Sequence, residues 1–113
     1  MLEVINSVYQ LPNSFVNLYL ILEPNGVTLI DTGLQKSGAV VVLSALKSLG
    51  QRATDLKRIM ITHADPDHIG SGAALKTASG ATVMIGRGDA PAMANGVASR
   101  PINNAIVKFV FGL

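Results

Sequence analysis

The chain has 113 residues, enough for one small domain, because single domains usually run to about 100–200 residues. Hydrophobic residues make up 49% and charged residues 14%, a balance that supplies a core and argues against a disordered chain. The net charge is only +2, the basic residues are dispersed and aromatic residues are few, so nucleic-acid binding is not expected. Cysteine is absent, so a metal ion would have to be bound by His, Asp or Glu.

The first residues show neither a signal peptide nor a membrane anchor. Met1-Leu2-Glu3-Val4 lacks a basic segment followed by an apolar run, and no apolar run approaches the ~18 residues of a membrane span. We therefore expect a cytoplasmic protein that makes no membrane contact.

The N-terminal third has the pattern of antiparallel strands. Two apolar, β-branched-rich runs at residues 13–22 and 26–30 are separated by Glu23-Pro24-Asn25-Gly26, and Asn-Gly between such runs is typical of a hairpin. Residues 4–11 predict a third strand, with Pro12-Asn13 as its turn.

The middle of the chain has the pattern of a βαβ unit. Apolar residues recur at helical spacing over residues 35–49, and Gly50 stands where a helix commonly ends in a left-handed residue. Ile59-Met60-Ile61 then forms a short apolar run, typical of a strand that is buried on both faces. We expect this strand, over residues 58–62, to lie parallel to the strand at 26–30.

A second helix is predicted over residues 66–79. Asp65 would cap it, Pro66 suits the first helical position, and Gly80 would end it. Residues 81–85 predict another short strand and residues 86–89 a turn. The pattern of residues 90–113 leaves the elements there open.

The predicted parallel strands place Asp31 and His63 at their carboxyl ends, where α/β sheets form ligand crevices. Asp31 in Asp31-Thr32-Gly33 also has a purely structural interpretation, as the start of an Asx-type turn.

The segment His63-Ala64-Asp65-Pro66-Asp67-His68 contains four potential metal ligands in six residues. Asp65 precedes a proline and is therefore extended, so His63 and Asp65, two residues apart, project to the same side. Asp67 and His68 would lie on the first helical turn, about 100° apart, and reach a second position. Alternatively, Asp65 and Asp67 only cap the helix and stabilise its dipole, although this does not explain why the chain's only two histidines flank them.

These motifs resemble those of the metallo-β-lactamase superfamily. The resemblance rests on Asp31-Thr32-Gly33 after an apolar strand and on the loop from Thr62 to Gly70, and it covers residues 13–86. It implies that His63 is a ligand of a first metal ion, that Asp67 and His68 are ligands of a second, and that Asp31 braces the ligand loop from outside the metal's own ligand set.

The sequence departs from the family pattern at two points. Asp65 stands where the family usually has a histidine, and this harder ligand favours iron or manganese, whereas the family implies zinc. No histidine follows His68, although the second half of the family fold supplies further ligands. Either the chain is a truncated piece, or another subunit completes the site, or the chain does not catalyse.

The resemblance implies a fold class of α/β, α+β sandwich type. Residues 1–113 would form a single partial domain, one half of an αββα sandwich with a mixed sheet and helices on one face. The implied activity is hydrolysis of a small-molecule ester, thioester, lactone, amide or phosphodiester by a metal-bound hydroxide, with Asp67 as the catalytic residue.

Two rival interpretations remain. A non-catalytic half-domain would keep the metal loop and self-associate as a homodimer or higher homo-oligomer, because the inner face of its sheet lacks a covering layer. A small metal-free α/β binding module would bind no metal at all.

Overall fold

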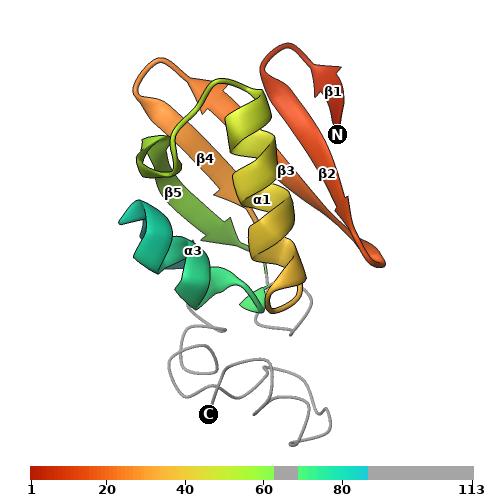
Figure 1. The fold of residues 1–113 in the computed structure, drawn as a ribbon, viewed down its shortest axis with the longest axis vertical. Coiled ribbons are helices and arrows are strands. Elements are labelled where there is room, and N and C mark those ends of the chain that lie inside the picture. The colour runs from red at the N-terminus through yellow and green to blue at the C-terminus, as the bar shows by residue number, and fades with distance from the viewer. Residues whose placement is uncertain (63–68, 87–113) are drawn as a thin grey trace, which may run out of the picture.

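The computed structural model describes residues 1–62 and 69–86. Within them the chain forms a six-stranded mixed sheet whose spatial order follows the sequence from β1 to β6. Neighbouring strands from β1 to β4 are antiparallel, whereas β5 is parallel to both β4 and β6. Helices α1 and α3 lie on one side of the sheet (Figure 1). The predicted fold class, a mixed sheet with helices on one face, is confirmed.

The strands and helices have the following bounds: β1 Leu2–Ile5, β2 Val8–Asn13, β3 Val16–Glu23, β4 Gly26–Ile30, α1 Ser37–Ser48, β5 Leu56–Ile61, α3 Gly72–Ser79 and β6 Thr82–Ile85. A short 3-10 helix at Ala53–Asp55 precedes β5. The predicted hairpin, first long helix, parallel strand pair and last strand are all present, each within three residues of its expected bounds.

The prediction of one strand over residues 4–11 is wrong. β1 ends at Ile5 and β2 begins at Val8, because the chain reverses at Asn6 and Ser7, where Ser7 adopts a φ of 66°. The two strands pair with each other, with a bulge between Glu3 and Ile5.

The predicted continuous helix over residues 66–79 is contradicted within the part that the structure describes. Gly70 and Ser71 form a turn and α3 begins only at Gly72. Glycine and serine are poor helix formers, and here both residues make contacts elsewhere that a continuous helix would prevent. Residues 66–68 lie outside the described part of the chain, as do the expected turn at 86–89 beyond Gly86 and the whole of 90–113.

Helix α1 ends in a Schellman motif. The N–H of Gln51 donates to the carbonyl of Leu46 at 2.8 Å, and the N–H of Gly50 donates to that of Lys47 at 3.1 Å. This geometry requires a left-handed residue, and Gly50 supplies it with a φ of 72°. The expectation that Gly50 stops the helix is confirmed.

The hydrophobic core lies between the helices and one face of the sheet. Cross-strand neighbours Leu20, Leu29 and Ile59 are fully buried on this face, and Val42 and Leu46 of α1 pack against it. The remaining buried apolar residues are Leu11, Leu18, Val27, Ala45, Leu56, Ile61, Ile69, Leu75 and Ala81. None of the helices in residues 1–62 and 69–86 is both long and apolar enough to cross a membrane.

Candidate metal-loop anchor

The carboxyl ends of β4 and β5 meet at one edge of the sheet. Ile30 and Met60 are paired residues of the two strands, and the N–H of Asp31 donates to the carbonyl of Met60 at 2.8 Å, which extends the ladder by one bond. Asp31 and Thr62, the residue after β5, are therefore neighbours at this edge. His63 itself lies outside the described residues.

Asp31 holds the residue that directly precedes His63. Its Oδ1 accepts a hydrogen bond from the backbone N–H of Thr62, and its Oδ2 accepts one from the Thr62 hydroxyl, both at 2.8 Å. Asp31 is buried, so both bonds are shielded from water. A simple turn accounts for neither bond, because Asx-type turns join residues two apart and Thr62 is 31 residues away.

The backbone of Asp31 is bent to make this contact possible. Its φ is 62°, in the left-handed region that non-glycine residues rarely adopt and that Asp tolerates better than most. The bend turns the chain out of β4 and leaves the carboxylate pointing along the sheet edge to Thr62. Strain of this kind concentrates at functional sites.

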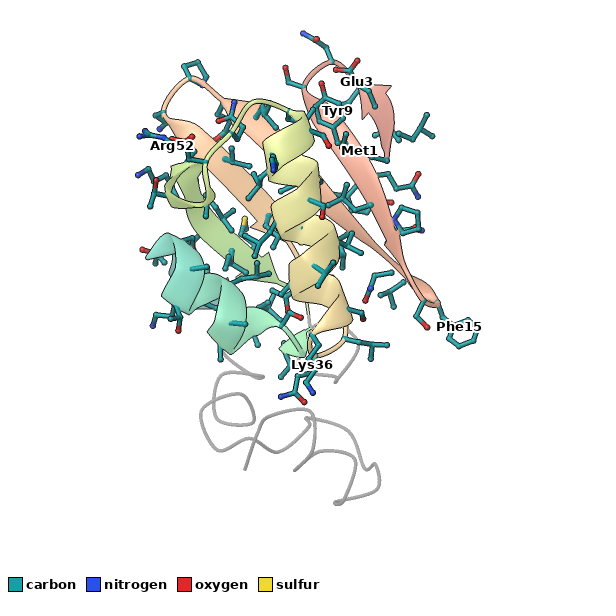
Figure 2. All side chains as sticks on the ribbon, viewed as in Figure 1. Met1, Glu3, Tyr9, Phe15, Lys36 and Arg52 are labelled. Atoms are coloured by element: carbon teal, nitrogen blue, oxygen red, sulfur yellow. The ribbon has the colours of Figure 1, made fainter. Side chains whose placement is uncertain are left out.

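A second group of contacts lies where α1 and α3 begin. Ser71 and Asn13 are buried polar residues there, and both bond to the backbone of Leu34. Lys36, which precedes α1, marks this end of the molecule in Figure 2. The sequence pattern did not predict a role for Asn13 or for Ser71. The signal that could have found this junction is Gly70-Ser71-Gly72, three poor helix formers in a row within a predicted helix.

The predicted ligands His63, Asp65, Asp67 and His68 all lie outside the described residues. Within residues 1–62 and 69–86 no group of three or more His, Cys, Asp or Glu side chains is placed to hold a metal ion. The structure therefore describes the two flanks of the loop, at Thr62 and at Ile69–Ser71, and the contacts that fix them.

Comparison with known proteins identifies the family. A family profile described as the metallo-beta-lactamase superfamily matches residues 11–108. A variant of a metallo-beta-lactamase from Cronobacter sakazakii is 33% identical with a TM-score of 0.77, over 84% of this chain and 37% of its own length. A beta-lactamase from Chitinophaga pinensis is 30% identical with a TM-score of 0.77, over 83% and 35%. The chain belongs to the metallo-β-lactamase superfamily.

Two Bacillus subtilis proteins are also similar. "Uncharacterized protein YobT" is 43% identical over 75 residues, which cover 66% of this chain and 30% of that protein. "Probable metallo-hydrolase YflN" is 36% identical over 72 residues, which cover 61% and 27%. The chain thus spans about a third of the length of the relatives and structures that it matches.

Proposed function

We propose that this chain binds divalent metal through the loop after β5 and supplies the metal-loop half of a metal-dependent hydrolase. The observation that carries the proposal is the pair of hydrogen bonds from Thr62 to Asp31. They fix the residue before His63 at the carboxyl edge of the sheet, and family membership implies a metal-dependent hydrolase. An ester, thioester, lactone, amide or phosphodiester of a small molecule is the proposed substrate.

The donor set of the loop fits a divalent ion. His63 and Asp65 would hold one ion, and Asp67 and His68 a second, with imidazole nitrogens and carboxylate oxygens that suit zinc, iron and manganese. The family favours zinc, whereas the carboxylate of Asp65 favours iron or manganese. When bound, such an ion makes water a nucleophile at neutral pH and polarises the bond under attack. The carboxylate of Asp67 would orient that water.

The isolated chain should bind metal without turning over substrate efficiently. Two histidines and two carboxylates are too few ligands for a two-metal hydrolytic site, and the chain spans only about a third of the length of its relatives. Turnover by the 113-residue chain that is lost on adding chelator would contradict this part of the proposal.

Metal binding is tested by equilibrium dialysis against Zn²⁺ or Mn²⁺ followed by elemental analysis. We expect wild type to retain metal and the double variant His63→Ala/His68→Ala to lose most of it. Glu3→Ala with Asp55→Ala is the matched control, because it removes two carboxylates that lie elsewhere in the structure. Equal retention by wild type and the histidine variant would overturn the proposal, as would no retention by either.

We propose self-association as a second candidate function, because one observation favours it. On the sheet face away from α1 and α3, a single row of paired residues crosses all six strands and is apolar except at one position. The row consists of Leu2, Gln10, Tyr19, Ile30, Met60 and Met84. Leu2, Met60 and Met84 are exposed large hydrophobic residues, although apolar side chains on an uncovered sheet are unfavourable in water.

The area of this face is sufficient for a weak dimer with a second copy of the chain. Six strands about 4.8 Å apart and roughly 18 Å long present about 500 Å² of sheet. Two such faces would bury on the order of 1,000 Å², at the lower end of what specific interfaces need. Pairing of like faces about a two-fold axis is the commonest closed assembly.

A further inference from the structure

The peptide groups of Leu34 are held by two side chains from distant parts of the chain. The N–H of Leu34 donates to Oδ1 of Asn13 at 2.9 Å, and its carbonyl accepts a hydrogen bond from the Ser71 hydroxyl at 2.6 Å. Asn13 is the last residue of β2, whereas Ser71 directly precedes α3. The loop between β4 and α1 is therefore held by hydrogen bonds from the end of β2 and from the residue before α3.

The Ser71 hydroxyl also caps helix α1. Its oxygen accepts a hydrogen bond from the N–H of Ala39 at 2.8 Å, and Ala39 is in the first turn, where N–H groups have no partner within the helix. Lys36, the residue in the N-cap position, makes no side-chain cap hydrogen bond. Ser71 supplies from another element the cap that α1 lacks in its own sequence.

Two glycines bring the backbones into direct contact at the same place. A Cβ atom on Gly70 would lie 2.4 Å from the backbone nitrogen of Gln35 and 2.7 Å from the carbonyl oxygen of Gly33. A Cβ atom on Gly38 would lie 2.0 Å from the carbonyl oxygen of Thr32. The turn before α3 and the loop before α1 therefore pack without side chains between them, which leaves little room for either to shift.

Both flanks of the segment 63–68 are thus bonded to one stretch of chain, residues 31–39. Thr62 is bonded to Asp31, and Ser71 to Leu34 and Ala39. Because all of these bonds are to the same stretch of chain, they constrain the separation of the two flanks. Contacts outside a metal's own ligands that orient those ligands typically change metal affinity 10–100-fold when removed.

We propose that Ser71 is a positioning residue for the metal loop, acting through Leu34 and the first turn of α1. The proposal rests on the metal binding proposed above. Replacing Ser71 by Ala removes one donated and one accepted hydrogen bond and releases the downstream flank, which begins one residue after His68. The apparent affinity for a divalent ion then falls about ten-fold.

The test is a titration of the full chain with Co²⁺, followed by its visible absorption, for wild type, Ser71→Ala and Ser79→Ala. Ser79 is a matched control, because its hydroxyl donates to the Leu75 carbonyl at 2.6 Å and accepts from the Ala81 N–H at 3.1 Å, at the far end of α3. We expect about ten-fold weaker binding and an altered Co²⁺ spectrum for Ser71→Ala, and for Ser79→Ala an affinity within about two-fold of wild type.

Equal effects of the two serine substitutions, or none for Ser71→Ala, would overturn the positioning role while leaving metal binding intact. Absence of Co²⁺ binding by wild type would overturn the proposed function and this inference with it. Should Ser71→Ala fail to fold, Asn13→Ala releases Leu34 from its other side, and Ser37→Ala serves as its control, since it removes only the 3.2 Å bond from Asn13 Nδ2. Unchanged Co²⁺ affinity in a folded Asn13→Ala protein would then refute the inference.

Discussion

Asp31 is the residue that connects the carboxyl ends of β4 and β5, through its two hydrogen bonds to Thr62. Its place after an apolar strand predicted a position at the sheet edge, and family resemblance implied a bracing role for the ligand loop. The structure adds the left-handed backbone and both hydrogen bonds to Thr62. Sequence alone could not separate a brace from a turn, because both begin with an aspartate after a strand and differ only in a partner 31 residues away.

Replacement of Asp31 tests the strength of this brace. Asp31→Ala removes two shielded hydrogen bonds to a carboxylate, each contributing about 1.5–3 kcal/mol, and leaves alanine in a left-handed conformation that costs roughly 1 kcal/mol more. We expect the free energy of unfolding to fall by about 4–7 kcal/mol in urea denaturation. Asp31→Asn keeps the size and the tolerance for positive φ, so its loss should be less than half as large. Equal losses for both variants would show that the carboxylate is not the source of stability.

Asp65, as a proposed ligand, should influence which metal the loop prefers. Replacement by histidine exchanges a hard oxygen ligand for imidazole, so Asp65→His should raise the affinity for Zn²⁺ relative to Mn²⁺ by about ten-fold. Competition between the two ions on both proteins measures this ratio. An unchanged ratio would argue that Asp65 is not a metal ligand.

At the scale of elements, the pattern of apolar residues located the strands and the helix that bury apolar side chains in the core. The hairpin of β3 and β4 was predicted from Asn-Gly between two apolar runs, helix α1 from apolar residues at helical spacing, and strand β5 from a short apolar run. The errors fall where tertiary contacts replace local propensity. The turn at Asn6-Ser7 contains no glycine or proline, and the break at Gly70-Ser71 exists because that backbone packs against residues 33–35.

Replacement of Gly38 by Ala should have two opposing effects on the stability of the protein. Gly38→Ala in a helix would ordinarily stabilise by about 1 kcal/mol, but here the new Cβ would lie 2.0 Å from a backbone oxygen of Thr32. Overpacking against backbone costs about 1–3 kcal/mol or more, so we expect a net destabilisation of about 2 kcal/mol in thermal or urea unfolding. Gly86→Ala meets nothing within 4 Å and should change stability little. A Gly38→Ala protein that is more stable than wild type would show that the backbone at Thr32 can move away from the new Cβ atom.

At the scale of the whole molecule, the sheet is covered on one face only within residues 1–62 and 69–86 (Figure 1). The apolar row from Leu2 to Met84 on the other face predicts a dimer with a micromolar dissociation constant. Light scattering after size exclusion at increasing concentration measures the mass. Met60→Glu should shift the chain to monomer, because it places a charge within the row.

Val40→Glu is the matched control for Met60→Glu. Val40 is also an exposed apolar residue, 65% accessible, but lies on α1 away from the row. We expect its variant to associate like wild type. A wild-type chain that stays monomeric and folded at about 100 µM would contradict a self-associating half-domain and would favour coverage of this face by another partner.

The ligands of the candidate site stay a prediction, whereas the contacts that support its flanks could not be predicted from the sequence. Four potential ligand residues within six positions, and the only two histidines of the chain among them, predicted a metal loop. Asn13 and Ser71 both form hydrogen bonds to the backbone of Leu34, from 21 and 37 residues away. No rule of sequence spacing connects residues that far apart. Long-range polar contacts of this kind follow from the packed fold.

The most direct test of the central claim is nuclear magnetic resonance of the histidine side chains during Zn²⁺ titration. The chain has only two histidines, so the imidazole signals report on His63 and His68 and on nothing else. We predict that both sets of ¹⁵N signals move to metal-bound positions as Zn²⁺ is added and no longer respond to pH near 6.5, the ordinary pKa of histidine. Imidazole signals that keep their free positions and their normal pH titration in the presence of excess Zn²⁺ would contradict a metal-binding loop at residues 63–68.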